Sequence, residues 1–344
     1  MSTGFFDRPR CVLPTHFPSV ASMCSRNQSF QVEVRTSSNI IKHHDSNNIM
    51  SLKSTLRDLS HPILRHLAFS LPAKVEQHVI RIPILEGTGL GVYEQFRRGE
   101  EAWKLALYRR LPGDSGNLFL DVGANLGQTL IELRQVDTHR PYLGFEPNPD
   151  CLHYVYRLIK INEFPNVELV AAGIGDSTGL LTLYLPAGRS TDSTATLLED
   201  LRPEREYDTR HVPIFSDEHV NGLIAKRPLG FVKIDVEGAE LEVLRGIQGI
   251  LRRERPPILC EVLFTDPKGD LEASRTRNEN IMSLLRDLNY RVLQIRKSPD
   301  LRSTVGFVPI EIFPVDYYCP ANMHECDYLF LPDERAEELL NKMA

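Results

Sequence analysis

A short strand, a tight turn and the start of a helix follow one another between residues 118 and 128, and this order restricts the fold more than any other stretch. Leu118 to Val122 is an apolar run that contains one acid, Asp121. The glycines at 123 and 127 permit positive φ or the close approach of a ligand, and helical patterning resumes after them. The first N–H groups of that helix are free to bind a nucleotide-like ligand. We therefore expect a cofactor-binding turn at the end of a buried strand.

The spacing of this turn disfavours a nicotinamide cofactor. A Gly-x-Gly-x-x-Gly turn would need glycine where this chain has Asn125 and Gln128. A second apolar run, residues 142–145, ends at Glu146, 19 residues after Gly127. An acid at this place accepts hydrogen bonds from ribose hydroxyls. Nicotinamide and adenosyl cofactors both carry that ribose, so Glu146 alone does not separate them.

Composition favours one main domain that binds small molecules. The chain has 344 residues, of which 42% are hydrophobic and 25% charged. No run approaches 18 apolar residues, so we expect no membrane span, and the net charge of -6 argues against a nucleic-acid partner. Six cysteines without an apolar leader segment indicate reduced thiols in an intracellular compartment, and we expect the cytoplasm.

The first 44 residues differ from the rest, with five basic residues against two acids, frequent serine and no periodicity. A disordered tail is our interpretation, and an organelle-targeting segment is the alternative. We divide the chain into this tail at 1–50, a lead-in of helix and strand at 51–111, and a catalytic domain at 112–344. Helical spacing predicts helices at 51–71 and at 92–111.

Strands and helices then alternate, which predicts a parallel sheet with right-handed crossovers. Ligands bind at the carboxyl ends of such strands, so Asp121, Glu146 and Asp176 are expected to line one cleft. Asp176 could reach an adenine edge, or it is only a turn residue in Gly-Asp-Ser-Thr-Gly. Residues 189–196 form a polar loop that we place over the cleft.

Residues 231–240, Phe-Val-Lys-Ile-Asp-Val-Glu-Gly-Ala-Glu, form a second informative stretch. Their apolar positions predict another buried strand with Asp235 near its carboxyl end, pointing into the cleft. Lys233 and Glu237 are expected to have mainly structural roles. A further strand at 258–263 carries Glu261.

Four motifs together resemble the FkbM family of S-adenosylmethionine-dependent methyltransferases across roughly residues 92–264. They are Asp121-Val-Gly-Ala-Asn-Leu-Gly127, Glu146-Pro147, Lys233-Ile-Asp-Val-Glu-Gly-Ala-Glu240 and the strand with Glu261. The resemblance implies a class I methyltransferase (Rossmann-like) α/β fold, with a seven-stranded mostly parallel sheet, helices on both faces and an antiparallel last strand. Ser216 departs from the family pattern, which bears on local packing.

The resemblance also implies roles for residues. S-adenosylmethionine would be the cofactor, and its methionine end would be held by Asp121, Gly123, Asn125 and Gly127. Glu146 would hold the ribose, and Asp176, from its place after a strand, stays the candidate for the adenine edge. Asp235 is the first candidate for a catalytic base, followed by Glu237, Glu261 and His211.

No metal set is complete in the sequence, because Cys319, His324 and Cys326 lack a further Cys or His pair. A Mg²⁺ site at Asp235 is left open.

Three functions remain. The first is O-methylation of a hydroxyl on a sugar or polyketide-like small molecule, as the resemblance implies. The second is a catalytically silent module that binds an adenosyl ligand or a protein. The third is a nicotinamide-dependent oxidoreductase, which Asn125 and Gln128 disfavour.

Overall fold

The computed structural model describes residues 68–75, 77–110, 116–224 and 227–343. The expected tail at 1–50 lies outside these ranges and stays a prediction. Most of the helix expected at 51–71 also lies outside them, but residues 68–71 belong to a strand, so that end of the expected helix is wrong.

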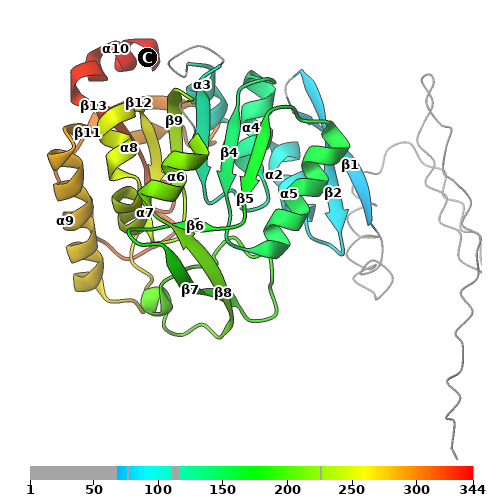
Figure 1. Cartoon of the computed structure of the whole chain (residues 1–344), viewed down its shortest axis with the longest axis horizontal. Helices are drawn as coiled ribbons and strands as arrows, with labels where there is room; N and C mark the ends of the chain where they lie inside the picture. Colours follow the sequence, from blue (N-terminus) through cyan, green and yellow to red (C-terminus); the bar gives the residue numbers. More distant parts are fainter. Residues whose placement is uncertain (1–67, 76, 111–115, 225–226, 344) are drawn as a thin grey trace, which may run out of the picture. The chain divides into compact units, whose positions relative to one another are not determined.

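Eight strands of the described residues form one mostly parallel sheet (Figure 1). From one edge to the other they are β12 (Thr304–Pro309), β11 (Tyr290–Lys297), β13 (Asp327–Pro332), β10 (Ile258–Glu261), β9 (Leu229–Ile234), β3 (Leu118–Val122), β4 (Tyr142–Phe145) and β5 (Val167–Val170). The strands from β10 to β5 are parallel, and β13 is antiparallel to both of its neighbours. This confirms the expected class I methyltransferase sheet of seven strands, to which β12 adds an eighth at one edge.

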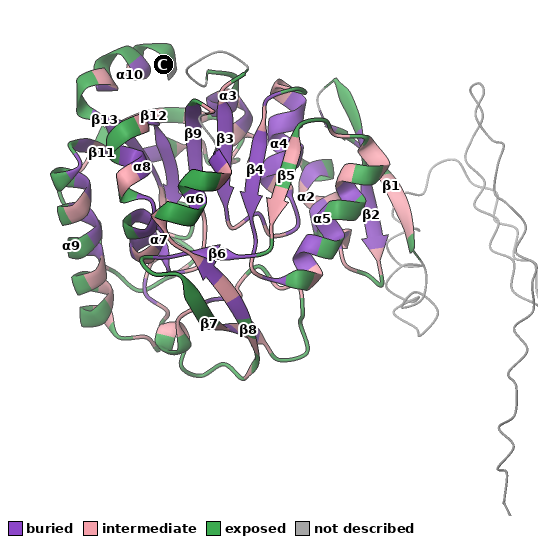
Figure 2. Ribbon diagram, in the orientation of Figure 1, coloured by how far each residue is buried: buried purple, intermediate pink, exposed green. Residues whose placement is uncertain are grey.

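The middle strands form because their runs of apolar residues are buried on both faces. Every residue of β3 and β9 is buried, as the centre of the sheet in Figure 2 shows. Alternation along β3 sends Leu118 and Leu120 to one core and Phe119 to the other. Asp121 therefore faces the same layer as Phe119.

Helices cover both faces, as expected. The Phe119 face packs against α2 (Leu90–Arg98), α3 (Trp103–Arg109), α4 (Gln128–Val136), α5 (Pro149–Asn162), α10 (Ala336–Met343) and the hairpin of β1 (Ala68–Val75) and β2 (His78–Leu85). The opposite face packs against α6 (Asp217–Ile224), α7 (Glu240–Gly246), α8 (Gln248–Glu254) and α9 (Leu271–Asp287). Two short 3₁₀ turns lie at η2 (Glu199–Leu201) and η3 (Asp333–Arg335). No helix among the described residues has the length and apolar character needed to cross a bilayer.

The single helix expected at 92–111 is wrong. The chain leaves α2 at Gly99, whose φ of 66° is left-handed, and α3 begins only at Trp103. Glycine ends helices in this way because it has no Cβ to oppose positive φ. The apolar spacing continues across the break, which explains why periodicity alone joined the two helices.

A smaller sheet lies beside the main one at the carboxyl ends of its strands (Figure 1). Within the described ranges it contains β6 (Gly173–Ile174), β8 (Tyr207–Phe215) and β7 (Gly179–Pro186), and its own small core includes Leu183 and Ile214. The alternation of residues 179–185 predicts the strand β7. β8 has no such pattern, because its sequence mixes charged and apolar residues.

Gly246, at the end of α7, lies against the backbone that follows β6 of the smaller sheet. A Cβ at this buried position would lie 2.3 Å from the backbone oxygen of Gly175, which cannot move like a side chain. We expect Gly246→Ala to lower the free energy of unfolding by about 1–3 kcal/mol. The control is Gly222→Ala in α6, where a Cβ would meet no described atom within 4 Å and helix propensity should add roughly 0.5–1 kcal/mol. Urea unfolding measures both, and shifts in the same direction would contradict this account.

Candidate active site

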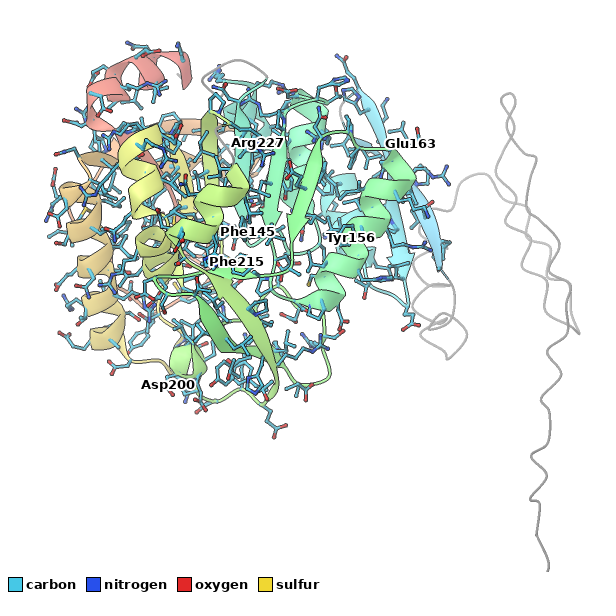
Figure 3. All side chains as sticks on the ribbon, in the orientation of Figure 1. Phe145, Tyr156, Glu163, Asp200, Phe215 and Arg227 are labelled. Carbon is cyan, nitrogen blue, oxygen red and sulfur yellow. The ribbon has the colours of Figure 1, made fainter. Side chains whose placement is uncertain are left out.

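A cavity of about 270 Å³ lies at the carboxyl ends of the parallel strands. The tips of β3, β4, β9 and β10 line it with residues 122–124, Phe145, 233–236 and Glu261. Figure 3 labels Phe145 at this end of β4. Open α/β sheets bind ligands at this edge. The structure thus brings together the glycine turn and the acids that follow three different strands.

Gly123 allows the tips of β3 and β9 to approach each other. Its φ is +89°, and a Cβ there would lie 1.8 Å from the carbonyl oxygen of Asp235. The N–H of Asp235 donates to the carbonyl oxygen of Val122 at 3.0 Å. A side chain at position 123 would force these strands apart. Gly123 therefore keeps Asp235 beside the turn.

Glu146 is held by two backbone groups. One carboxylate oxygen accepts from the N–H of Asn125 at 2.7 Å and the other from that of Asn148 at 2.8 Å. Burial raises the pKa of Glu146 to about 7, although both N–H groups act in the opposite direction. Each carboxylate oxygen can accept more than one hydrogen bond, so Glu146 can also accept ribose hydroxyls from the cavity that it lines.

Two buried oxygen atoms in the cavity wall have no hydrogen-bond partner among the described residues. They are Oδ1 of Asn125 and Oε1 of Gln128, on the turn and in the first turn of α4. Buried polar atoms are normally paired, because an unpaired one costs about 1–3 kcal/mol. These acceptors fit a ligand that carries hydrogen-bond donors, such as the ammonium group of an amino acid.

The cavity wall is apolar on the side of the smaller sheet, which we call the apolar end of the cavity. Ile174 from β6, Leu183 from β7, and Ala195 and Leu197 from the following segment line it. An apolar slot next to a ribose-binding acid suits a planar base. Polar loop residues at 189–196 were expected over the cleft, and this segment does supply part of the wall.

Asp235 lies at the polar end, where Lys233 supports it. The Lys233 ammonium is 3.0 Å from Oδ2 of Asp235. Burial would raise the pKa of Asp235, but Lys233 and Lys104 outweigh it and bring the pKa below its ordinary value. Asp235 is therefore ionised at neutral pH and can accept a proton or a hydrogen bond.

Two further acids line the cavity, Glu261 on β10 and Asp327 on β13. They are directly paired residues of these two antiparallel strands. Burial and the charges of Asp235 and Asp327 raise the pKa of Glu261 well above its usual range. The thiol of Cys326 donates to Glu261 at 3.0 Å. Glu261 therefore keeps its proton more readily than Asp235. Among the described residues, no group of three or more His, Cys, Asp or Glu is arranged to hold a metal ion.

Glu237 lines the cavity, but its carboxylate and its backbone oxygen already accept hydrogen bonds from other residues. Its Oε2 accepts from Arg202 at 2.5 Å and its backbone oxygen from the hydroxyl of Thr196 at 2.7 Å. Burial and Asp235 raise its pKa to about 7 against the effect of Arg202. This pairing fits the structural role expected for Glu237 better than the catalytic one.

A family model for the methyltransferase FkbM domain matches residues 121–292, which is half of the chain. The chain belongs to the FkbM methyltransferase family. S-adenosylmethionine is the cofactor of this family. Its ribose, amino-acid end and adenine fit the Glu146 carboxylate, the unpaired oxygens of Asn125 and Gln128, and the apolar end of the cavity.

The FkbM-family chain is similar to two fungal proteins at low identity. Methyltransferase 1 of Beauveria bassiana (strain ARSEF 2860) is 23% identical over 189 residues, covering 50% of this chain and 74% of that protein. Methyltransferase sdnD of Sordaria araneosa is 28% identical over 164 residues, covering 39% of this chain and 61% of that protein.

A crystal structure of an FkbM methyltransferase from Methylobacillus flagellatus KT is 15% identical with a TM-score of 0.37. That match covers 65% of this chain but only 47% of the solved one. The strand order described above defines the class I methyltransferase fold of this chain.

Asp121, the first acid of the FkbM motif, does not line the cavity. It is fully buried beneath it, where Oδ2 accepts from the hydroxyl of Tyr142 at 2.5 Å and Oδ1 lies 3.7 Å from the Lys233 ammonium. The direct contact with the methionine end that we expected is therefore corrected. Asp121 supports Lys233, which in turn holds Asp235.

Three other expected site residues also lie elsewhere. A Cβ at Gly127 would meet the Leu158 side chain at 2.9 Å, so this glycine serves the packing of α4 on α5. Asp176 is exposed in the turn after β6 and is not among the described residues that line the cavity, which favours its reading as a turn residue. His211 is exposed on β8, outside the cavity lining.

Sequence reasoning missed several residues of the cavity wall. They are Gln95 on α2, Glu101 between α2 and α3, Lys104 on α3 and Asp327 on β13. The Lys104 ammonium pairs with Glu101 at 2.6 Å. In the sequence these charged residues resemble the polar side of an amphipathic helix, so no local pattern predicts that they line the cavity.

Glu132 is buried behind this wall, one helical turn after Gln128. Burial raises its pKa to about 8, against the opposing charge of Lys104, and its Oε2 has no hydrogen-bond partner among the described residues. The folded chain thus keeps a proton that the unfolded chain releases near pH 4.5. Between these pH values the unfolded state binds fewer protons, so Glu132 makes the folded state less stable as pH rises.

We expect Glu132→Gln to remove this dependence. Relative to the wild type, its free energy of unfolding should fall less steeply from pH 5.5 to 7.5, by up to about 1.4 kcal/mol per pH unit. Urea unfolding at three pH values measures the slopes. The matched control is Glu163→Gln at the exposed end of α5, labelled in Figure 3. Parallel slopes for the wild type and Glu132→Gln would show that Glu132 does not titrate in this range.

Proposed function

We propose that the chain transfers the methyl group of S-adenosylmethionine to a hydroxyl group of a sugar or polyketide-like small molecule. The observation that carries this proposal is the ionised carboxylate of Asp235, which lines the cavity and is kept beside the glycine turn by Gly123. A hydroxyl acceptor must lose its proton during methylation, and a positioned carboxylate is a suitable base.

The chain's own residues divide the work of binding. Glu146 accepts hydrogen bonds from the ribose, and Asn125 and Gln128 accept from the amino-acid end. When bound, the cofactor supplies a methyl group that is already electrophilic. The protein then has mainly to align the acceptor oxygen and exclude water.

The proposed reaction needs only one base, because a single proton leaves the acceptor. The acceptor oxygen forms the new carbon–oxygen bond while the carbon–sulfur bond breaks, and the hydroxyl proton passes to Asp235. Lys233 contributes by holding Asp235 at 3.0 Å and by keeping its carboxylate ionised, the form that can take a proton. Glu261, whose pKa is well above its usual range, can donate rather than accept a hydrogen bond next to the base.

The pKa of Glu146 gives a test of the cofactor site. Because this pKa is about 7, the carboxylate becomes charged as pH rises from 6 to 8, and the affinity for S-adenosylmethionine should rise with it. Glu146→Gln should weaken binding about ten-fold or more and flatten this pH dependence. Calorimetric titration at pH 6, 7 and 8 measures both effects, with the exposed Asp176→Asn as control. Wild-type affinity in Glu146→Gln would remove Glu146 from the site.

Asp235→Asn tests the division between binding and chemistry. It should leave the affinity for S-adenosylmethionine within a few-fold of the wild type and lower turnover by about 10²–10⁴-fold, because the amide cannot take the proton. Labelled methyl transfer to a panel of hydroxylated acceptors, beginning with sugars, measures turnover. Loss of cofactor affinity equal to that of Glu146→Gln would contradict the assignment. A wild-type chain that binds the cofactor but methylates no hydroxyl would contradict the proposed acceptor class.

A further inference from the structure

The segment between β7 and β8, residues 187–206, forms part of the cavity wall, and we call it the strap. Asp192, Ser193, Ala195 and Leu197 of the strap line the cavity. The remaining wall comes mostly from the main sheet and the helices around it. A ligand at the apolar end of the cavity would therefore lie between the sheet and the strap.

One end of the strap is fastened to the residues just after β9. Nη2 of Arg202 donates to Oε2 of Glu237 at 2.5 Å, and Nη1 of Arg202 donates to the carbonyl oxygen of Thr194 at 3.1 Å. The hydroxyl of Thr196 donates to the backbone oxygen of Glu237 at 2.7 Å. Arg202 thus joins two parts of the strap to one residue of the main domain.

This fastening is shielded from water. The side chains of Arg202 and Glu237 are only 12% and 15% exposed. Leu198 and Leu201 of the strap pack over Gly238, where a Cβ would approach Leu201 to 3.0 Å. A charged hydrogen bond in such surroundings is stronger than an exposed ion pair, which contributes little.

The other end of the strap is fastened beyond β4. The side-chain amide of Asn148 donates to the carbonyl oxygen of Ser190 at 2.6 Å. Asn148 follows Glu146 by two residues, and Glu237 follows Asp235 by two residues. The strap therefore runs from a point beside the proposed ribose site to a point beside the proposed base.

We propose that Arg202 and Glu237 form a latch that holds the strap closed over the adenosyl end of the cofactor site. Arg202 is on this account a positioning residue, which sets how long the cofactor stays bound and takes no part in methyl transfer. The inference rests on the cofactor site of the proposed function. It also assigns Glu237, the neighbour of Asp235 in the same motif, to closure instead of chemistry.

The test compares Arg202→Met with Arg189→Met, a strap arginine whose side chain is 73% exposed. Bound labelled S-adenosylmethionine is chased with excess unlabelled S-adenosylhomocysteine to give the dissociation rate. We expect Arg202→Met to release the cofactor about ten- to hundred-fold faster, and Arg189→Met to stay within about two-fold of the wild type. Arg202→Lys, which keeps the charge but loses the planar guanidinium that reaches both Glu237 and Thr194, should fall between them.

A double-mutant cycle separates a latch from general damage to the fold. If Arg202 and Glu237 act on each other, Glu237→Gln combined with Arg202→Met should release the cofactor no faster than Arg202→Met alone. Multiplied effects of the two substitutions would overturn the latch.

Hydrogen exchange of the ligand-free proteins gives a reading that needs no cofactor. The strap should exchange faster in Arg202→Met, while β3 and β9 stay protected as in the wild type. Wild-type exchange in the strap together with wild-type release would overturn the latch and leave the proposed function intact. A wild-type chain that binds no S-adenosylmethionine would instead count against the proposed function, and the exchange data would still decide the latch.

Asp200, which lies in the same segment and is labelled in Figure 3, offers an exposed second control as Asp200→Asn.

Discussion

The contact between Gly123 and the backbone of Asp235 is the constraint on which the candidate site depends. The separation of 1.8 Å that a Cβ would have from the Asp235 oxygen leaves room only for glycine. Parallel pairing of β3 with β9 brings the two strands together, and the hydrogen bond from Asp235 to Val122 extends that pairing beyond their ends. The turn proposed to hold the cofactor and the acid proposed as base are consequently joined through paired strands, so their separation does not depend on loops.

Charge pairing beneath this piece explains the residues that do not reach the cavity. Lys233 is nearly buried between Asp121 and Asp235, and ionised groups so far from water are stable only when they are paired. Strand alternation places Asp121 and Lys233 on the same face, as directly paired residues of β3 and β9. The first acid of the FkbM motif is therefore connected to Asp235 through Lys233 and does not itself line the cavity.

The sequence carries the sheet and the turn more clearly than the walls of the site. β3, β4 and β9 were predictable because they are short apolar runs bounded by glycine or an acid, and Glu146 and Asp235 follow from their places at the strand ends. Lys104 and Arg202 were not, because each reaches the cavity or its cover only through contacts between distant segments. Arg202 and Glu237 are 35 residues apart. Asp176 shows the opposite error, since a plausible position after a strand proved to be an exposed turn.

The strand tips that form the floor of the cavity and the strap that covers it are held by different kinds of contact. This difference allows the cofactor to exchange without changing the place where methyl transfer is proposed. The floor consists of strands buried on both faces, whereas the strap depends on a few side-chain hydrogen bonds and the small core around Leu183 and Ile214. Regions with fewer buried apolar contacts open at lower free energy, so the strap can open while the floor stays formed. The cofactor can then exchange without disturbing Gly123 and Asp235. One motif, from Lys233 to Glu240, serves both parts, because Asp235 belongs to the floor and Glu237 holds the strap.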